Sequence, residues 1–183
     1  MTTATHPTTP RTPRSRVGNK QRAAASAPTR ASEAVAPYRV KRMHFAALLD
    51  CEAAQRIALA RDGVSAAWLG KLAMRMDIPQ ERVFSYLGIP RSTAIRKIQQ
   101  DKPLATDEGE RVLGLARLIG LVEKIVRESG KQKGFDAARW IASWLEQPLP
   151  ALAGQTPGAL MDTATGQQLV AGLLAQMQSG AYA

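Results

Sequence analysis

Residues 106–129 read TDEGERVLGLARLIGLVEKIVRES, and this stretch decides the fold. Thr106 belongs to the residue types that cap helices, and Asp107 and Glu108 follow in the first turn, where negative charge is favourable. The apolar residues cover most of the circumference of a helix: they stand at positions 112, 113, 115, 116, 118, 119, 121, 122, 125 and 126. A helix that is apolar nearly all round is buried. The stretch therefore predicts a long central helix against which the other elements pack.

Shorter helices are predicted on both sides of this central helix. Residues 43–61 are rich in Ala and Leu up to the turn at Asp62-Gly63, and Ser65 is the expected cap of the next helix. Thr156-Pro157 predicts a one-turn helix, and Thr163 the cap of a last helix with Leu169, Val170, Leu173, Leu174 and Met177 as its apolar stripe. A further helix shows apolar residues at helical spacing: Ala137, Trp140, Ile141, Trp144 and Leu145. No stretch alternates as a β-strand does, so the predicted fold class is all-α.

The net charge of +10 is concentrated at the N-terminus. Residues 1–42 hold nine Lys and Arg against one acid, whereas the remainder of the chain holds sixteen against fourteen. The charge by itself is therefore no sign that the folded part binds nucleic acid. Residues 1–42 are predicted to be a disordered basic tail, because they bury too little apolar surface to offset the entropy of ordering. Phosphate contacts, a solvated leader, a transit peptide and a true start at Met43 all remain open for this segment.

Composition argues against several classes of protein. The single cysteine, Cys51, and the two histidines, His6 and His44, offer neither a disulfide nor a set of metal ligands. The sequence shows no catalytic Ser/His/Asp or Cys/His arrangement and no Gly-rich phosphate loop, so neither an enzyme nor a cofactor is expected. The glycines at 109, 114 and 120 are interpreted as helix-packing positions. No apolar run is long enough to cross a bilayer, and one cysteine suits a reducing cytosol, which predicts a soluble, cytoplasmic protein.

Residues 78–102, IPQERVFSYLGIPRSTAIRKIQQDK, fit a helix–turn–helix. Such a motif needs a short first helix, a tight turn with Gly, and a second helix with a small, polar and basic outer face. Gly88 would make the turn, with Ile95 and Ile98 pointing inward from the second helix. The side chains expected to face outward and contact DNA are Arg91, Ser92, Thr93, Arg96 and Lys97. The arrangement resembles the Xre/Cro-type helix–turn–helix, although two bundle helices joined by a Gly-Ile-Pro turn would look the same.

The last fifty residues carry fixed spacings of Trp, Pro, Gly and Thr. The pattern WLxxPxPALxG runs from Trp144 to Gly154, TPxxLMxTxxG runs from Thr156 to Gly166, and a final helix with GxY follows. This pattern closely resembles the toxin-binding domain of the Xre/MbcA/ParS-like antitoxins. With the helix–turn–helix and the central helix, the resemblance extends over about residues 60–183. The chain has Leu152-Ala153-Gly154 where the family more often has Leu-Gly-Gly, a change that should preserve the loop.

The resemblance implies an antitoxin of a RES–Xre type II toxin–antitoxin pair. In that family the C-terminal domain binds a RES-type toxin, which degrades NAD or transfers ADP-ribose, and the helix–turn–helix represses the shared operon, usually as a dimer. The implied partners are a toxin encoded by the adjacent gene, operator DNA, and a second copy of the chain within a larger toxin–antitoxin complex. The implied toxin-binding residues are Trp144, Pro148, Pro150, Leu152, Gly154, Thr156, Pro157, Leu160, Gly166, Tyr182 and Ala183.

The domains expected on this basis are the tail 1–42, a helical region 43–130 with the helix–turn–helix (78–102) and the central helix (106–129), and a toxin-binding domain 131–183. The side chains of Trp140 and Trp144 are expected in the core rather than at an interface, whereas the Pro-Ala-Leu loop and the C-terminus should face a partner. The alternative function is a stand-alone transcriptional regulator whose C-terminal domain only dimerises.

Overall fold

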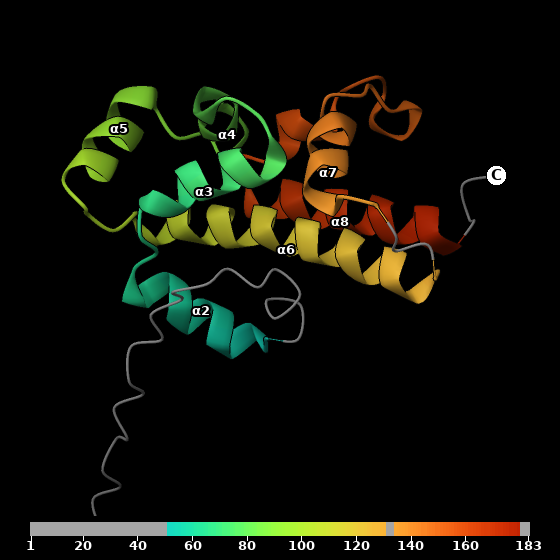
Figure 1. Ribbon diagram of the computed structural model, residues 1–183, viewed down its shortest axis with the longest axis horizontal. Coiled ribbons are helices and arrows are strands. Elements are labelled where there is room, and N and C mark those ends of the chain that lie inside the picture. The colour runs from blue at the N-terminus through green and yellow to red at the C-terminus, as the bar shows by residue number, and fades with distance from the viewer. Residues whose placement is uncertain (1–50, 131–133, 180–183) are drawn as a thin grey trace, which may run out of the picture. The chain divides into compact units, whose positions relative to one another are not determined.

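The structure is a computed structural model that describes residues 51–130 and 134–179 (Figure 1). These residues form α-helices and two short 3-10 helices without any β-strand, so the predicted all-α fold is confirmed. The basic tail 1–42, the beginning of the stretch 43–61, Tyr182 and Ala183 lie outside the described residues. The elements are α2 (Ala53–Asp62), α3 (Ala67–Met76), α4 (Gln80–Tyr86), α5 (Arg91–Gln99), α6 (Thr106–Glu128), α7 (Ala137–Leu145), η1 (Pro150–Leu152), η2 (Pro157–Leu160) and α8 (Ala164–Ser179).

Helix α6 is the central element, as its sequence predicts. It packs against α2, α3, α7 and α8 (Figure 1). Its start differs from the prediction by one residue, because Thr106 is the first helical residue and Ala105 holds the cap position. The carboxylate of Glu108 reaches back to accept a hydrogen bond from the Ala105 N–H at 2.8 Å. This bond satisfies a donor that an N-terminal helix end leaves free, so the hydroxyl of Thr106 is not needed as a cap.

One continuous hydrophobic core joins the helices before α6 with those after it. Leu69 and Leu72 of α3 are fully buried in the same core as Ile141 and Leu145 of α7. Helices α7 and α8 both pack on α6, and α7 also packs on α3. The regions 43–130 and 131–183, which the sequence separates, therefore share their apolar interior.

Close packing of α8 on α6 explains Gly114. A Cβ atom at this position would lie only 1.7 Å from the Gln167 side-chain oxygen. The Gln167 amide is nearly buried and donates to the carbonyl oxygens of Arg111 and Met161 at 3.0 and 2.8 Å. At Gly109 a Cβ would approach Val64 to 3.0 Å. Both glycines are thus packing positions, as interpreted from the sequence.

The segment between α7 and α8 contains more regular structure than a plain loop. Residues Pro150–Leu152 form η1, and Pro157–Leu160 form η2 with Thr156 at its cap position. The hydroxyl of Thr163 accepts a hydrogen bond from the Gly166 N–H at 3.0 Å, which confirms the expected cap of α8. Within residues 51–130 and 134–179, no helix is both long and apolar enough to span a membrane.

Candidate functional site

Helices α4 and α5 form the helix–turn–helix that the sequence predicts. Gly88 occupies the turn with a φ of +60°, a conformation that glycine adopts without steric cost. Ile89 is buried behind the turn, and its N–H donates to the Phe84 carbonyl at 2.9 Å. On α5 the fully buried residue is Ala94, whereas Ile95 and Ile98 are only half-buried against the core. Helix α5 therefore rests on the core through a small contact and exposes most of its surface.

The outer face of α5 carries four of the five residues predicted to contact DNA. Ser92 and Arg96 are exposed, and Thr93 is half-buried. Arg91 is exposed and forms a 3.4 Å ion pair with Glu81 of α4, with both side chains more than half accessible to solvent. No ion pair of Arg96 is found among the described residues, so its guanidinium is available to a ligand.

Lys97 departs from the prediction that it faces outward. Its ammonium forms a 2.5 Å ion pair with Glu108, and the two side chains are only 17% and 12% exposed. The Glu108 carboxylate also accepts the N–H of Ala105, so one acid joins the last turns of α5 to the start of α6. The reason for the departure is that the chain after α5 turns back at Asp101, which has a φ of +47°, and leads into α6. Lys97 therefore holds α5 in place and is not free to reach DNA.

The residues predicted to contact a toxin divide into exposed and buried groups. Pro148, Pro150 and Gly154 are exposed, and Leu152, Thr156 and Leu160 are half-buried, so the loop around η1 and η2 presents its surface to solvent. The loop is held by backbone bonds, because Leu149 accepts from the Gly154 N–H and donates to the Gln155 carbonyl, at 3.0 and 3.1 Å.

Trp144, Pro157 and Gly166 are buried and shape the segment from inside. Trp144 is 3% exposed and stacks on Trp140, with ring centroids 5.9 Å apart and planes 11° apart. The placement of Trp144 matches the expected core packing, while Trp140 is only half-buried. A Cβ on Gly166 would lie 1.9 Å from the Leu160 carbonyl oxygen, so η2 and α8 meet too closely for any side chain at this position.

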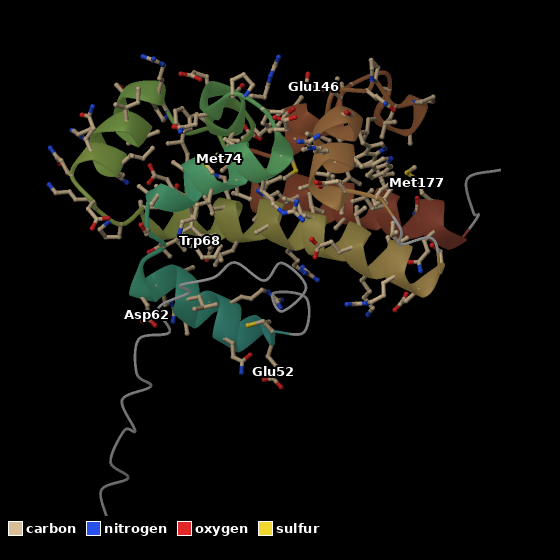
Figure 2. All side chains as sticks on the ribbon, in the orientation of Figure 1. Glu52, Asp62, Trp68, Met74, Glu146 and Met177 are labelled. Atoms are coloured by element: carbon tan, nitrogen blue, oxygen red, sulfur yellow. The ribbon has the colours of Figure 1, made fainter. Side chains whose placement is uncertain are left out.

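An exposed face of α8 is a feature that the helical pattern did not reveal. Within the predicted apolar stripe of α8, Val170, Leu173 and Leu174 are buried, whereas Leu169 is 51% and Met177 43% exposed. Met177 lies near the C-terminal end of α8 (Figure 2). Leu169 lies at one edge of this stripe, and Met177 lies toward the C-terminal end of α8, beyond the buried members of the stripe. The 16 residues of α8 contain no charged side chain. In the sequence, this absence of charged residues is the one pattern that indicates an exposed face unlike an ordinary solvated helix surface.

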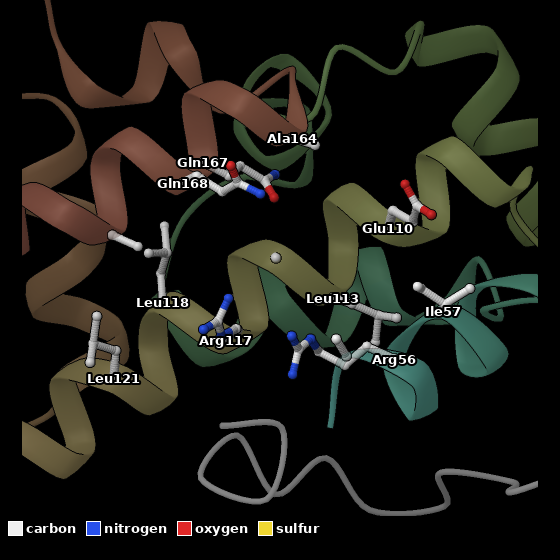
Figure 3. Close-up of a pocket in the computed structure, with 13 residues that line it drawn as sticks. Arg56, Ile57, Glu110, Leu113, Arg117, Leu118, Leu121, Ala164, Gln167 and Gln168 are labelled. Carbon is white, nitrogen blue, oxygen red and sulfur yellow. The ribbon is translucent and has the colours of Figure 1, made fainter. Parts of the chain in front are cut away.

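A cleft of about 340 Å³ lies between α2, α6 and α8. Figure 3 shows Arg56 of α2 and Arg117 of α6 pointing toward the same space. Leu113, Leu118 and Leu121 supply its apolar wall. Among the residues that the structure describes, no group of His, Cys, Asp or Glu side chains is placed to hold a metal ion.

Comparisons with known proteins match both halves of this arrangement. Residues 55–117 match the family model described as the antitoxin Xre-like helix-turn-helix domain. Residues 134–180 match the model described as the antitoxin Xre/MbcA/ParS C-terminal toxin-binding domain. The predicted Xre-like helix–turn–helix and toxin-binding domain are thereby confirmed as domain types, and neither model describes a catalytic domain.

Similar proteins are antitoxins. The chain is 42% identical over 147 residues to the "Prs ADP-ribosylating antitoxin" of Sphingobium sp. strain YBL2, which covers 80% of this chain and 89% of that protein. It is 32% identical over 120 residues to an "Antitoxin Xre" of Pseudomonas putida, covering 65% of this chain and 68% of the relative. An "Antitoxin Xre" of Yersinia enterocolitica is 24% identical over 120 residues, with 66% and 76% covered. In helix–turn–helix, central helix and toxin-binding segment alike, the chain belongs to the Xre/MbcA/ParS family of antitoxins.

Proposed function

We propose that this antitoxin neutralises a RES-type toxin, one that degrades NAD or transfers ADP-ribose, and represses its own operon through the helix–turn–helix. The observation that carries the proposal is that α8, in the segment matching the toxin-binding domain, has no charged side chain and exposes Leu169 and Met177, while α5 exposes Arg91, Ser92 and Arg96. The name of the Sphingobium relative, which refers to ADP-ribosylation, supports this choice of toxin chemistry. The antitoxin would act in the cytoplasm, where DNA and NAD are both present.

The proposed toxin surface consists of the loop around η1 and η2 and the exposed face of α8. Large apolar side chains that are exposed on a stable helix are typical of protein interfaces. Within 131–183 the backbone bonds of the loop hold it in one shape, which lowers the entropy lost when a partner binds. The residues proposed to contact the toxin are Pro148, Pro150, Leu152, Gly154, Thr156, Leu160, Leu169 and Met177, with Tyr182 and Ala183 retained from the sequence pattern.

The proposed DNA surface is the outer face of α5. Arg96 and Arg91 can bond to guanine edges or phosphates, and Ser92 and Thr93 can bond to base edges. A single helix reads few base pairs, so we propose that two copies of the chain bind two half-sites about 34 Å apart, one turn of DNA. The region 43–130 would then serve DNA and the region 131–183 the toxin, in one complex.

The decisive experiment for toxin binding expresses the adjacent gene with and without this chain. We expect the adjacent product alone to stop growth, and the antitoxin to restore growth and co-purify with it. Leu169→Asp combined with Met177→Asp should abolish both effects by placing charge on the uncharged face. Met74→Asp is the matched control, because Met74 is 81% exposed on α3, outside the proposed surface. Full rescue by the α8 variant would remove α8 from the interface.

The test of operator binding uses DNA from upstream of the operon and fluorescence anisotropy. Arg96→Ala should weaken binding about tenfold or more, as expected for loss of a base or phosphate contact. Arg117→Ala is the matched control, since this exposed arginine lies in the α2/α6/α8 cleft and not on α5. Equal affinity of the two variants would exclude Arg96 from the DNA surface.

The uncharged face of α8 also favours a second candidate, a stand-alone regulator that dimerises through its C-terminal segment. An adjacent product that is harmless and does not bind the chain, together with dimer dissociation in the Leu169→Asp/Met177→Asp variant, would establish this candidate instead.

A further inference from the structure

Tyr86, the last residue of α4, lies between the two functional regions. Its side chain is 5% exposed, and its hydroxyl donates a hydrogen bond to Glu146, which follows α7. Burial, and then the Glu146 carboxylate, raise the pKa of the Tyr86 hydroxyl above its ordinary value. The hydroxyl therefore stays protonated and acts as the donor in this contact. The end of α4 is thus tied to the end of α7.

Gly158 provides the surface on which the Tyr86 ring rests. A Cβ at Gly158 would lie 2.8 Å from the Tyr86 ring and equally close to the Leu145 carbonyl oxygen. Any side chain at this position would push the ring, or the backbone that ends α7, out of place. Gly158 belongs to η2, inside the segment that matches the toxin-binding domain.

Two further contacts join the same elements. Arg82 of α4 forms a 3.5 Å ion pair with the Glu146 carboxylate. At the turn of the helix–turn–helix, a Cβ on Gly88 would come within 3.0 Å of the Asp162 side chain, so the turn lies directly against the residues that lead into α8. Residues that follow α7 and surround η2 therefore contact both α4 and the turn.

Helix α5 has a limited number of other contacts that set its direction. Its only fully buried residue is Ala94, and its ion pair with α6 is the one between Lys97 and Glu108. Ile95 and Ile98 are half-buried against the core, and α5 also packs against α4. A shift of α4 would accordingly be passed on to α5 through the turn between them.

We infer that Glu146 and Gly158, two residues of the toxin-binding segment, are positioning residues for the helix–turn–helix: they hold α4 through Tyr86 and Arg82 and so fix the orientation of α5. Neither residue would touch DNA or belong to the proposed toxin surface. The consequence for DNA affinity rests on the proposed function, whereas the consequence for the order of α4 and α5 does not.

Hydrogen–deuterium exchange of the full chain tests the inference directly. In Glu146→Ala, the amides of residues 80–100 should exchange about fivefold faster, which corresponds to the loss of one hydrogen bond, while those of α6 keep their rate. Glu146→Gln should retain most of the protection, because its amide oxygen still accepts from Tyr86. Glu128→Ala is the matched control: Glu128 is a half-exposed carboxylate on α6, paired with Lys124.

Arg82, Tyr86 and Glu146 line a cleft of about 400 Å³. Because the Glu146 side chain is partly exposed to solvent, we expect Glu146→Ala to leave the protein folded. Gly158→Ala is the stronger perturbation, and Gly172→Ala, where no atom lies within 4 Å of the added Cβ, is its control. Exchange in 80–100 that matches the Glu128→Ala control, or that accelerates equally in every helix, would overturn the inference.

Operator affinity, measured on the same variants well below their melting temperatures, provides the second readout. We expect about fivefold weaker binding for Glu146→Ala and little change for Glu146→Gln, with toxin capture preserved in both. Unchanged operator affinity in Glu146→Ala would refute the positioning role even if the exchange rates rise. If the wild-type chain binds no operator DNA, the proposed repressor function fails, and the exchange pattern alone decides whether Glu146 and Gly158 position α4 and α5.

Discussion

The contrast between Lys97 and Arg96 offers the sharpest test of how α5 works. The two residues are adjacent, and the sequence assigned both to DNA binding. The structure places Lys97 in a mostly buried ion pair with Glu108 and leaves Arg96 exposed. Replacing each with alanine should therefore produce different defects.

The size of the Lys97→Ala effect depends on the Glu108 carboxylate, which would remain mostly buried without its ion-pair partner. Removing one partner of a buried ion pair costs about 3–5 kcal/mol, whereas an exposed pair is worth about 0–1 kcal/mol. The Glu108 carboxylate would keep its hydrogen bond from the Ala105 N–H, which reduces the cost. We expect Lys97→Ala to lower the free energy of unfolding by about 2–3 kcal/mol. Arg96→Ala should change it by less than about 0.5 kcal/mol, because exposed side chains rarely contribute more.

Urea denaturation followed by circular dichroism measures the first effect, and anisotropy of labelled operator DNA at low temperature measures the second. Arg96→Ala should retain stability and lose DNA affinity. Lys97→Ala should lower the free energy of unfolding. Lys97→Met, which keeps the apolar stem without the charge, should lower the free energy of unfolding by a similar amount. Equal stability of the alanine variants, with DNA affinity lost in both, would refute the reasoning and return Lys97 to the DNA surface.

Three further predictions concern packing, ionisation and domain independence. Gly114→Ala should destabilise the protein by about 1–3 kcal/mol, because its Cβ would overlap the Gln167 side chain, while Gly172→Ala in the open face of α8 should stabilise it by about 0.5–1 kcal/mol; thermal melting of both variants provides the comparison. The raised pKa of Tyr86 means that its contribution to stability is complete below the ordinary tyrosine pKa of about 10 and is lost as pH rises above it; Tyr86→Phe should flatten this loss in urea titrations between about pH 9 and 11, and identical slopes would contradict it. Deleting residues 134–183 should leave a chain without cooperative unfolding, because α6 loses its partners in α7 and α8; a sharp calorimetric transition of the truncated chain would show that the helix–turn–helix region folds alone.

The sequence predicted those features that depend on neighbouring residues. The central helix was recognisable because its apolar residues surround it, and the cap at Thr163 because a hydroxyl in that position bonds within three residues. The helix–turn–helix was recognisable because Gly88 and the flanking apolar residues lie within one short stretch. In each case the physical cause is local, so the pattern is sufficient.

Features that depend on distant residues were not predictable in the same way. Lys97 meets Glu108 only because the chain reverses after α5, and Tyr86 meets Glu146 across 60 residues of sequence. The helical period gave the direction of the α8 stripe but not which of its members the rest of the fold covers, and Leu169 and Met177 are exposed. The family pattern includes Trp144, but the pattern does not say whether this residue contacts a partner or packs in the core. The structure places Trp144 in the core.

The shared interior of the two regions bears on how such antitoxins can diversify. Consider a hybrid that joins the first part of one relative to the last part of another between α6 and α7. Its core would combine apolar side chains from two proteins whose shapes are not complementary to each other. Leu69 and Leu115 would meet foreign counterparts of Ile141 and Val170, and Tyr86 would meet a foreign Gly158. Substitutions on the exposed sides of α5 and α8 carry no such penalty. New operator and toxin specificities should therefore arise in this lineage by surface substitution more readily than by exchange of modules, and engineered hybrids should transplant the exposed faces while keeping one parental core.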